Sequence, residues 1–118
     1  MSKRKDIDLI QDIKECIIRI KSYTQSVDYS SFVEDYKTQD AVIRNLEIIG
    51  EAVKSLSEEI KRNYPGIPWK NISGTRDKLI HDYFGVNIDI VWDIAKKEIP
   101  NLEPMVDNII NNIKDKNG

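Results

Sequence analysis

Residues 38–62 read TQDAVIRNLEIIGEAVKSLSEEIKR, and this stretch decides the class of fold. Its apolar residues recur at alternating spacings of four and three, which is the period of a helix with one buried face. These residues are Val42, Leu46, Ile49, Val53, Leu56 and Ile60. Thr38 and Asp40 precede them and are residue types that cap helix N-termini. The pattern therefore predicts one long helix from about Thr38 to Arg62.

The segment before this helix follows the same period. Residues 6–26 repeat isoleucines three and four apart, at Ile10, Ile13, Ile17 and Ile20. This spacing predicts a second amphipathic helix. After the long helix, residues 63–68 read NYPGIP, where two prolines remove backbone donors and glycine favours a turn. We expect a short connection there.

Three further helices are predicted in the C-terminal half. The first runs from a hydroxyl cap at Ser73 to Gly85, which we expect to end it in the left-handed conformation. The second starts at Asn87 or Asp89 and stops near Pro100, and the last starts near Asn101 with Pro104 in its first turn. No segment alternates like a strand.

The sequence thus predicts an all-α bundle of four to five helices. At 118 residues the chain has room for one domain, 1–118, with an ordered core of about 6–113 and short charged tails. The start of the chain carries charge and no apolar signal segment, and no run is long enough to span a bilayer. We expect a cytoplasmic protein with no membrane contact.

Charge and cysteine content narrow the function classes. The net charge is −2, which argues against coating nucleic acid by bulk electrostatics but allows a local basic spot. Residues available for such a spot are Arg44, Lys70, Arg76 and Lys78. Cys16 is the only cysteine and His81 the only histidine, so these side chains cannot build a structural zinc site. We expect no metal, and the sequence has no glycine loop that would hold a nucleotide cofactor.

The segment RDKLIHDY, residues 76–83, concentrates the chemistry of the chain. Arg76 offers a fixed cation for phosphate oxygens, His81 a proton shuttle and Tyr83 a hydroxyl that can be modified. Asp77 lies one helical turn before His81 and is placed to orient the imidazole. Taken singly, each of these side chains also fits an ordinary surface or packing role.

Helix geometry separates the members of this motif. On an ideal helix Arg76 and Tyr83 point within about 20° of each other, whereas Arg76 and His81 differ by about 140°. One straight helix therefore cannot easily aim Arg76 and His81 at a single atom. Either the helix is distorted, or the residues line a cleft between two chains. A two-fold dimer is the more natural way to build the site.

Other residues are interpreted as structural. Gly50 interrupts a helical pattern where glycine costs about 1 kcal/mol relative to alanine, which predicts close helix packing at that point. The polar residues around it are interpreted as a solvated face or a support network, and the aromatic and apolar residues near the motif as packing residues. The first set is Arg44, Asn45, Glu47 and Glu51, and the second is Trp69, Leu79, Ile80, Phe84 and Trp92.

The motif resembles the R-x4-H-x-Y motif of HEPN domains, and more narrowly that of the HepT-like (DUF86) branch. Three further blocks carry the resemblance in the same order along the chain: KTQDAVIRNLEIIGEA at 37–52, YPGIPW at 64–69, and FGV at 84–86 with Val91-Trp92. The likeness covers almost the whole chain. Thr75 departs from the apolar residue expected at its position and leaves the motif intact.

The resemblance implies a helical HEPN bundle, usually a homodimer with the motif in the cleft between protomers. It implies the toxin half of a type VII-like toxin–antitoxin pair, a metal-independent endonuclease acting on RNA with no cofactor. Arg76 and His81 are then the catalytic residues, with Asp77 and Lys78 in supporting or orienting roles. The implied partner is an MntA-type nucleotidyltransferase antitoxin that transfers AMP to Tyr83. The alternative is a non-catalytic HEPN module that binds a nucleotide or a partner protein.

Overall fold

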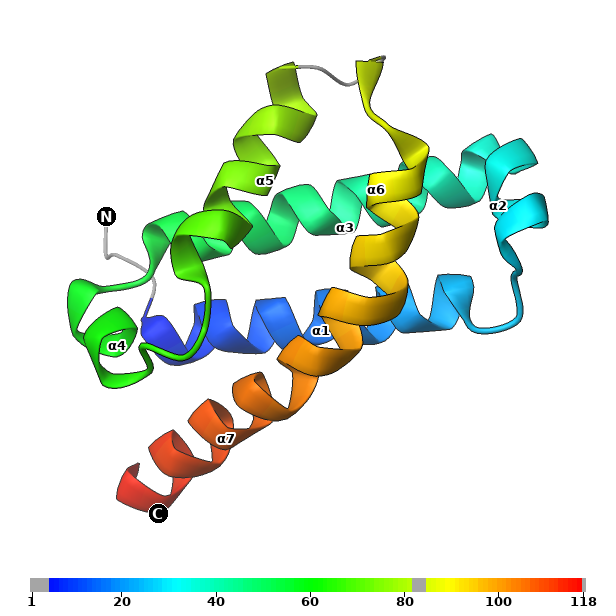
Figure 1. Cartoon of the computed structure of the whole chain (residues 1–118). Helices are drawn as coiled ribbons and strands as arrows, with labels where there is room; N and C mark the ends of the chain where they lie inside the picture. The colour runs from blue at the N-terminus through cyan, green and yellow to red at the C-terminus, as the bar shows by residue number, and fades with distance from the viewer. Residues whose placement is uncertain (1–4, 82–84, 118) are drawn as a thin grey trace.

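Helices joined by short connections make up the part of the chain that the computed structural model describes, residues 5–81 and 85–117 (Figure 1). In chain order they are α1 (Asp6–Thr24), α2 (Tyr29–Glu34), α3 (Tyr36–Ser55), α4 (Glu58–Asn63), α5 (Trp69–His81), α6 (Ile88–Asp93), the π-helical segment η2 (Ile94–Glu98) and α7 (Ile99–Asn117). Within the described ranges there is no strand. The prediction of an all-α, HEPN-type bundle is confirmed.

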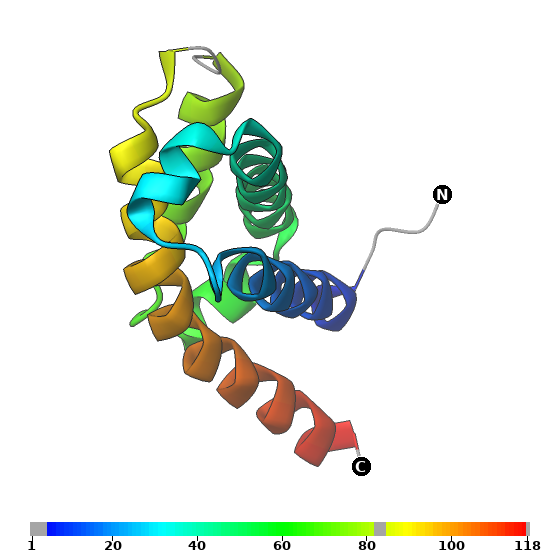
Figure 2. The same ribbon diagram turned by 90° about the vertical axis from the view of Figure 1, so that its right-hand side faces the viewer.

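The core lies between α1 and α3 and the helices that cover them. Figure 2 looks along α1 and α3, which run side by side, and shows α6, η2 and α7 as one rod beside this pair. α5 packs on α3, and α7 packs on α1. The predicted apolar faces of α1 and α3 are confirmed as core. The buried residues of these faces are Ile10, Ile13, Ile17 and Ile20 on α1 and Val42, Leu46, Ile49 and Val53 on α3, and Leu56 and Ile60 beyond the end of α3 are buried as well.

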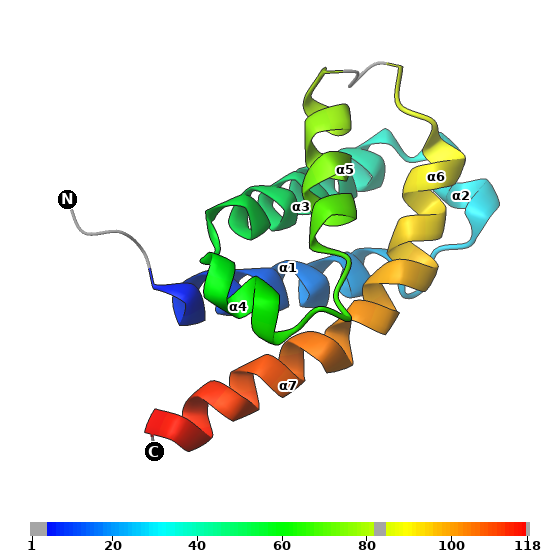
Figure 3. The same cartoon turned by 60° about the vertical axis from the view of Figure 1, so that its left-hand side comes forward.

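The prediction of one continuous helix from Thr38 to Arg62 is wrong, because the helix breaks at residues 56–57 and the chain starts a second helix. α3 ends at Ser55, Leu56 has an extended backbone (ψ 148°), and Ser57 caps the short helix α4. The backbone N–H and the hydroxyl of Ser57 donate to the two oxygens of Asp6, at 2.9 and 2.5 Å. These bonds hold α4 beside the start of α1, as Figure 3 shows, and replace those that a continued helix would make.

Short helix α2 was not predicted. Asp28 caps it by accepting a hydrogen bond from the backbone N–H of Ser31 at 2.8 Å. Its six residues are too few to show a helical period, although Phe32 is fully buried against the core. Asp35 then caps α3 through the N–H of Thr38, so Thr38 lies in the first turn and is not the cap.

Pro100 does not end a helix, contrary to the prediction. α6, η2 and α7 follow one another directly, with right-handed helical backbone at both joints. A proline at position 100 lacks an N–H and clashes with the carbonyl four residues earlier in a regular helix. The wider π turn, in which the N–H of Ile99 bonds to the carbonyl of Ile94, accommodates it. Pro104 accordingly lies inside α7.

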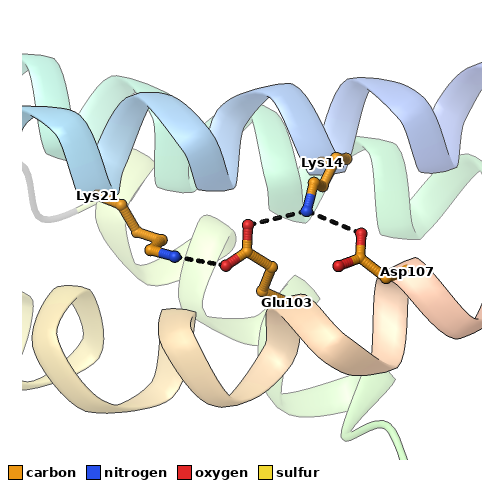
Figure 4. Close-up of polar contacts among 4 residues, drawn as sticks. All are labelled: Lys14, Lys21, Glu103 and Asp107. Atoms are coloured by element: carbon orange, nitrogen blue, oxygen red, sulfur yellow. Dashed lines mark hydrogen bonds and ion pairs between the residues drawn. The ribbon is translucent and has the colours of Figure 1, made fainter.

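Charged residues join α1 to α7 on the outside of the bundle (Figure 4). Glu103 bonds to Lys14 at 2.8 Å and to Lys21 at 2.5 Å, and Lys14 also pairs with Asp107 at 2.7 Å. The Glu103 side chain is 19% exposed. The pKa of Glu103 lies below its ordinary value, first because of the bond from Lys14 and then because of that from Lys21. This network fixes α7 along α1.

Candidate active site on helix α5

Helix α5 carries the part of the Arg–His motif that the structure describes. It begins at Trp69, four residues before the predicted cap at Ser73. The carbonyl of Pro68 accepts the first helical hydrogen bond, from the backbone N–H of Ile72 at 3.1 Å. Proline is tolerated at this position because the backbone N–H groups at the start of a helix have no partner within it. The indole N–H of Trp69 donates to the carbonyl of Tyr64 at 3.0 Å. The connection therefore fixes where α5 starts.

The other end of α5 differs from the prediction as well. Gly85 does not have the left-handed backbone conformation expected of it. The described part of α5 ends at His81. Tyr83 and Phe84 lie outside the described residues, so their predicted roles stay predictions. Of the two neighbouring apolar residues, Leu79 is buried as predicted, whereas Ile80 is 41% exposed and is not a core residue.

Arg76 packs against Gly50, at a point where α5 lies close to α3. A Cβ atom built on Gly50 would lie 2.1 Å from the Cβ and 2.9 Å from the Cγ of Arg76, and 3.2 Å from the carbonyl oxygen of Ile72. Such distances leave no room for any side chain at position 50. The close packing predicted at Gly50 is confirmed, and its partner is the motif arginine itself.

The guanidinium of Arg76 is only partly neutralised by the protein. Its Nη1 donates to Oδ1 of Asp77 at 3.0 Å, and its Nε is buried without a partner among the described residues. The side chain as a whole is 26% exposed. A buried N–H without an acceptor is costly, so Arg76 keeps donor capacity that the described residues do not use and that an anion could satisfy.

The carboxylate of Asp77 is shared between two cations. Besides Arg76, it accepts a hydrogen bond from the ammonium of Lys54, which projects from the last turn of α3. These two bonds, that from Lys54 first, hold the pKa of Asp77 below its ordinary value. Sequence reasoning missed Lys54. The signal was present, since Lys54 follows Gly50 by four residues and so lies on the same face of α3.

His81 lies on a different face of α5 from Arg76, in line with the helix geometry. It is exposed, and its imidazole makes no hydrogen bond or ion pair with another residue of the described part of the chain. Asp77, which the sequence placed as its orienting partner, is instead bonded to Lys54 and Arg76. Lys78 is exposed, as are Arg44 and Lys70. A substrate or a second chain has open access to His81.

An apolar groove runs beside α5. One part, of about 530 Å³, lies between α5 and α6 and is lined by residues such as Leu79, Val86 and Ile90. A second part, of about 210 Å³, continues between α5 and the η2–α7 junction and includes Thr75 and Met105. Ile90 and Met105 remain 50% and 41% exposed. Exposed apolar residues gathered along one groove are typical of surfaces that bind another chain.

The described part of the chain contains neither a group of side chains suited to a metal ion nor a helix suited to crossing a membrane. No three side chains among its His, Cys, Asp and Glu residues gather closely enough to hold a metal ion. None of its helices combines the length and apolarity needed to cross a membrane.

Comparison with known proteins identifies relatives over most of the chain. A family model described as "Ribonuclease HepT-like" matches residues 13–109. A Thermococcus cleftensis protein named "Probable ribonuclease HepT" is 46% identical over 101 residues, which cover 86% of this chain and 92% of that protein. A Shewanella oneidensis protein named "mRNA nuclease HepT" is 30% identical over 127 residues, covering 87% and 94%. No solved structure matches the chain significantly.

Proposed function

Because the chain belongs to the family of HepT-like ribonucleases, we propose that it is an RNA endonuclease in which Arg76 and His81 are the catalytic residues. The observation that carries this proposal is the state of Arg76. The start of its side chain, Cβ and Cγ, is fixed against Gly50, while its buried Nε is left without a partner among the described residues. An arginine held in this way is prepared to bind a phosphate group.

The proposed reaction needs no metal ion. The 2′-hydroxyl of the ribose attacks the adjacent phosphorus and displaces the 5′-oxygen of the next nucleotide. His81 takes the proton from the attacking hydroxyl or gives one to the leaving oxygen, and the exposure of its imidazole supports that role. Arg76 stabilises the negative charge that grows on the phosphoryl oxygens.

Two copies of the chain form the proposed site. Arg76 and His81 lie on different faces of α5, so one chain does not bring them to one phosphate. The groove beside α5, with its exposed Ile90 and Met105, offers apolar surface for a two-fold partner. In such a dimer, Arg76 of one protomer and His81 of the other meet at the same cleft.

Control of the activity is proposed to act on Tyr83. The protein is then the toxin of a type VII-like pair, and an MntA-type nucleotidyltransferase transfers AMP from ATP to the tyrosine hydroxyl. The transfer joins the α-phosphate to the tyrosine oxygen and releases pyrophosphate. The added anion competes with RNA phosphate for Arg76. Incubation with the partner and ATP should add the mass of AMP to wild type but not to Tyr83→Phe.

RNA cleavage by purified protein in the presence of EDTA tests the nuclease proposal. Arg76→Ala and His81→Ala should each lower the rate by a factor of roughly 10² or more, as is usual for electrostatic and acid–base contributions. Arg62→Ala is a matched control, because Arg62 is exposed on α4, away from the motif helix. Equal cleavage by all four proteins would refute the site, and loss of cleavage with EDTA would refute metal independence.

The second candidate is a non-catalytic module that binds a nucleotide or partner protein. The net charge of −2 favours it, since an acidic chain gains little from bulk attraction to RNA. This candidate predicts no cleavage by wild type, while nucleotide binding or dimer stability still falls in Arg76→Ala. The cleavage assay and a binding titration on the same samples separate the two candidates.

A further inference from the structure

Two residues of α3, one helical turn apart, contact two consecutive residues of the motif. Gly50 meets the Cβ and Cγ of Arg76, and Lys54 bonds to the carboxylate of Asp77. Residues four apart on a helix lie on the same face, so this face of α3 supports the motif at two adjacent points. Figure 1 shows α5 crossing α3, and the two helices pack on each other.

We propose that Lys54 is a positioning residue for Arg76, which acts by occupying the carboxylate of Asp77 and so leaves the guanidinium free to bind an RNA phosphate. This inference rests on the proposed nuclease function and adds a residue that the motif does not contain.

The charges at this contact determine how strongly Asp77 competes with a phosphate for Arg76. Arg76 and Asp77 alone form a neutral pair, in which the carboxylate competes directly with an incoming phosphate for the same donors. With Lys54 the group holds two cations and one anion, a net charge of +1. Because Lys54 and Arg76 share the same oxygen of Asp77, each bond draws on an acceptor already engaged by the other cation. The ammonium therefore weakens the hold of Asp77 on the arginine.

Lys54 can be changed without opening the core. Its side chain is 42% exposed and that of Asp77 is 44% exposed, so the contact lies at the surface above the packed Gly50–Arg76 contact. Lys54→Ala should lower kcat/KM for RNA cleavage about tenfold, the size typical of one charge-assisted hydrogen bond. Lys54→Arg should retain most of the activity, because it keeps a cation within reach of the carboxylate.

The decisive measurement repeats Lys54→Ala in an Asp77→Asn background. If Lys54 acts through the carboxylate, its loss has no further effect once the negative charge is gone. The same reduction in both backgrounds would instead mean that Lys54 contacts RNA itself and would overturn the proposal. So would unchanged cleavage by Lys54→Ala. Lys37→Ala is the matched control, since Lys37 is an exposed lysine at the opposite end of α3.

A second readout does not depend on cleavage. Carboxyl NMR should show the pKa of Asp77 rising toward its ordinary value in Lys54→Ala but not in Lys37→Ala. If the pKa of Asp77 is the same in wild type and in Lys54→Ala, the positioning role is overturned even if wild type cleaves RNA. Conversely, wild type that never cleaves RNA while Asp77 responds to Lys54 would refute the nuclease function and leave this contact established.

Discussion

Replacing Gly50 by alanine tests the close contact between α3 and α5. The added Cβ would lie 2.1 Å from the Cβ of Arg76, whereas carbon atoms in contact are separated by about 3.5–4.0 Å. The Cβ of Arg76 is fixed to the backbone and cannot rotate away, so α5 itself must move by more than about 1 Å. Overpacking of this kind costs about 1–3 kcal/mol, and the upper end applies because backbone must shift.

The gain from helix propensity partly offsets this cost. Alanine is favoured over glycine inside a helix by about 1 kcal/mol, so Gly50→Ala should lower the free energy of unfolding by about 2 kcal/mol. Urea denaturation followed by circular dichroism measures this change in the free energy of unfolding. The slope of that free energy against urea concentration should stay unchanged. Gly74→Ala on α5 is the matched control, because a Cβ there meets nothing within 4 Å. It should gain up to about 1 kcal/mol. A Gly50→Ala protein as stable as Gly74→Ala would refute the reasoning.

Two further predictions concern long-range polar contacts. Glu103→Gln should lower the free energy of unfolding by about 1 kcal/mol at neutral pH, because it weakens the bonds to Lys14 and Lys21. Urea denaturation at a series of pH values measures this loss and its pH dependence. The pKa of Glu103 is lower in the folded protein than its ordinary value. The stabilisation by Glu103 is therefore present above its ordinary pKa and is lost as the pH falls through the folded value. The difference in the free energy of unfolding between wild type and variant should vanish in acid. Ser57→Ala should cost about 1–2 kcal/mol in the same assay at neutral pH, because it removes both the cap of α4 and a bond to Asp6.

Matched variants make these two predictions specific. Glu34→Gln changes an exposed glutamate on α2 and should have little effect at any pH. Ser55→Ala removes an exposed hydroxyl two residues before Ser57 and should leave stability nearly unchanged. A Glu103→Gln difference that persisted in acid, or equal losses in the two serine variants, would contradict the roles given to these contacts.

The spacing of apolar residues along the chain predicted the helices that bury one face. The isoleucines of α1 and the apolar face of α3 recur with a helical period, and burial of one face is enough to define such helices. The end of α3 was not predictable in this way. It depends on a bond between Ser57 and Asp6, residues far apart in the sequence, and the apolar period runs on through the break.

The candidate site likewise has some features that the sequence predicts and others that depend on contacts between helices. Gly50 predicted close packing because glycine is costly in a helix, and the structure identifies Arg76 as what packs there. The separation of Arg76 from His81 also followed from helix geometry. The actual partner of Asp77 could not be read from α5, because a salt bridge to Lys54 depends on how α3 and α5 cross. The directions in which side chains of one helix point were predictable, and the partners that they bond to across two helices were not.

The π-helical segment η2 has a consequence for chain length. Buried Val91 and Ile99 flank it and are eight residues apart, which in a regular helix would turn them about 80° away from each other. The wide turn absorbs one residue and keeps both on the buried side. A homologue without a proline at position 100 could therefore lose one residue between 94 and 98 and keep both Val91 and Ile99 buried in an ordinary helix. The same deletion within α7 would rotate every later side chain off the core. Insertions and deletions among relatives should gather at this one turn.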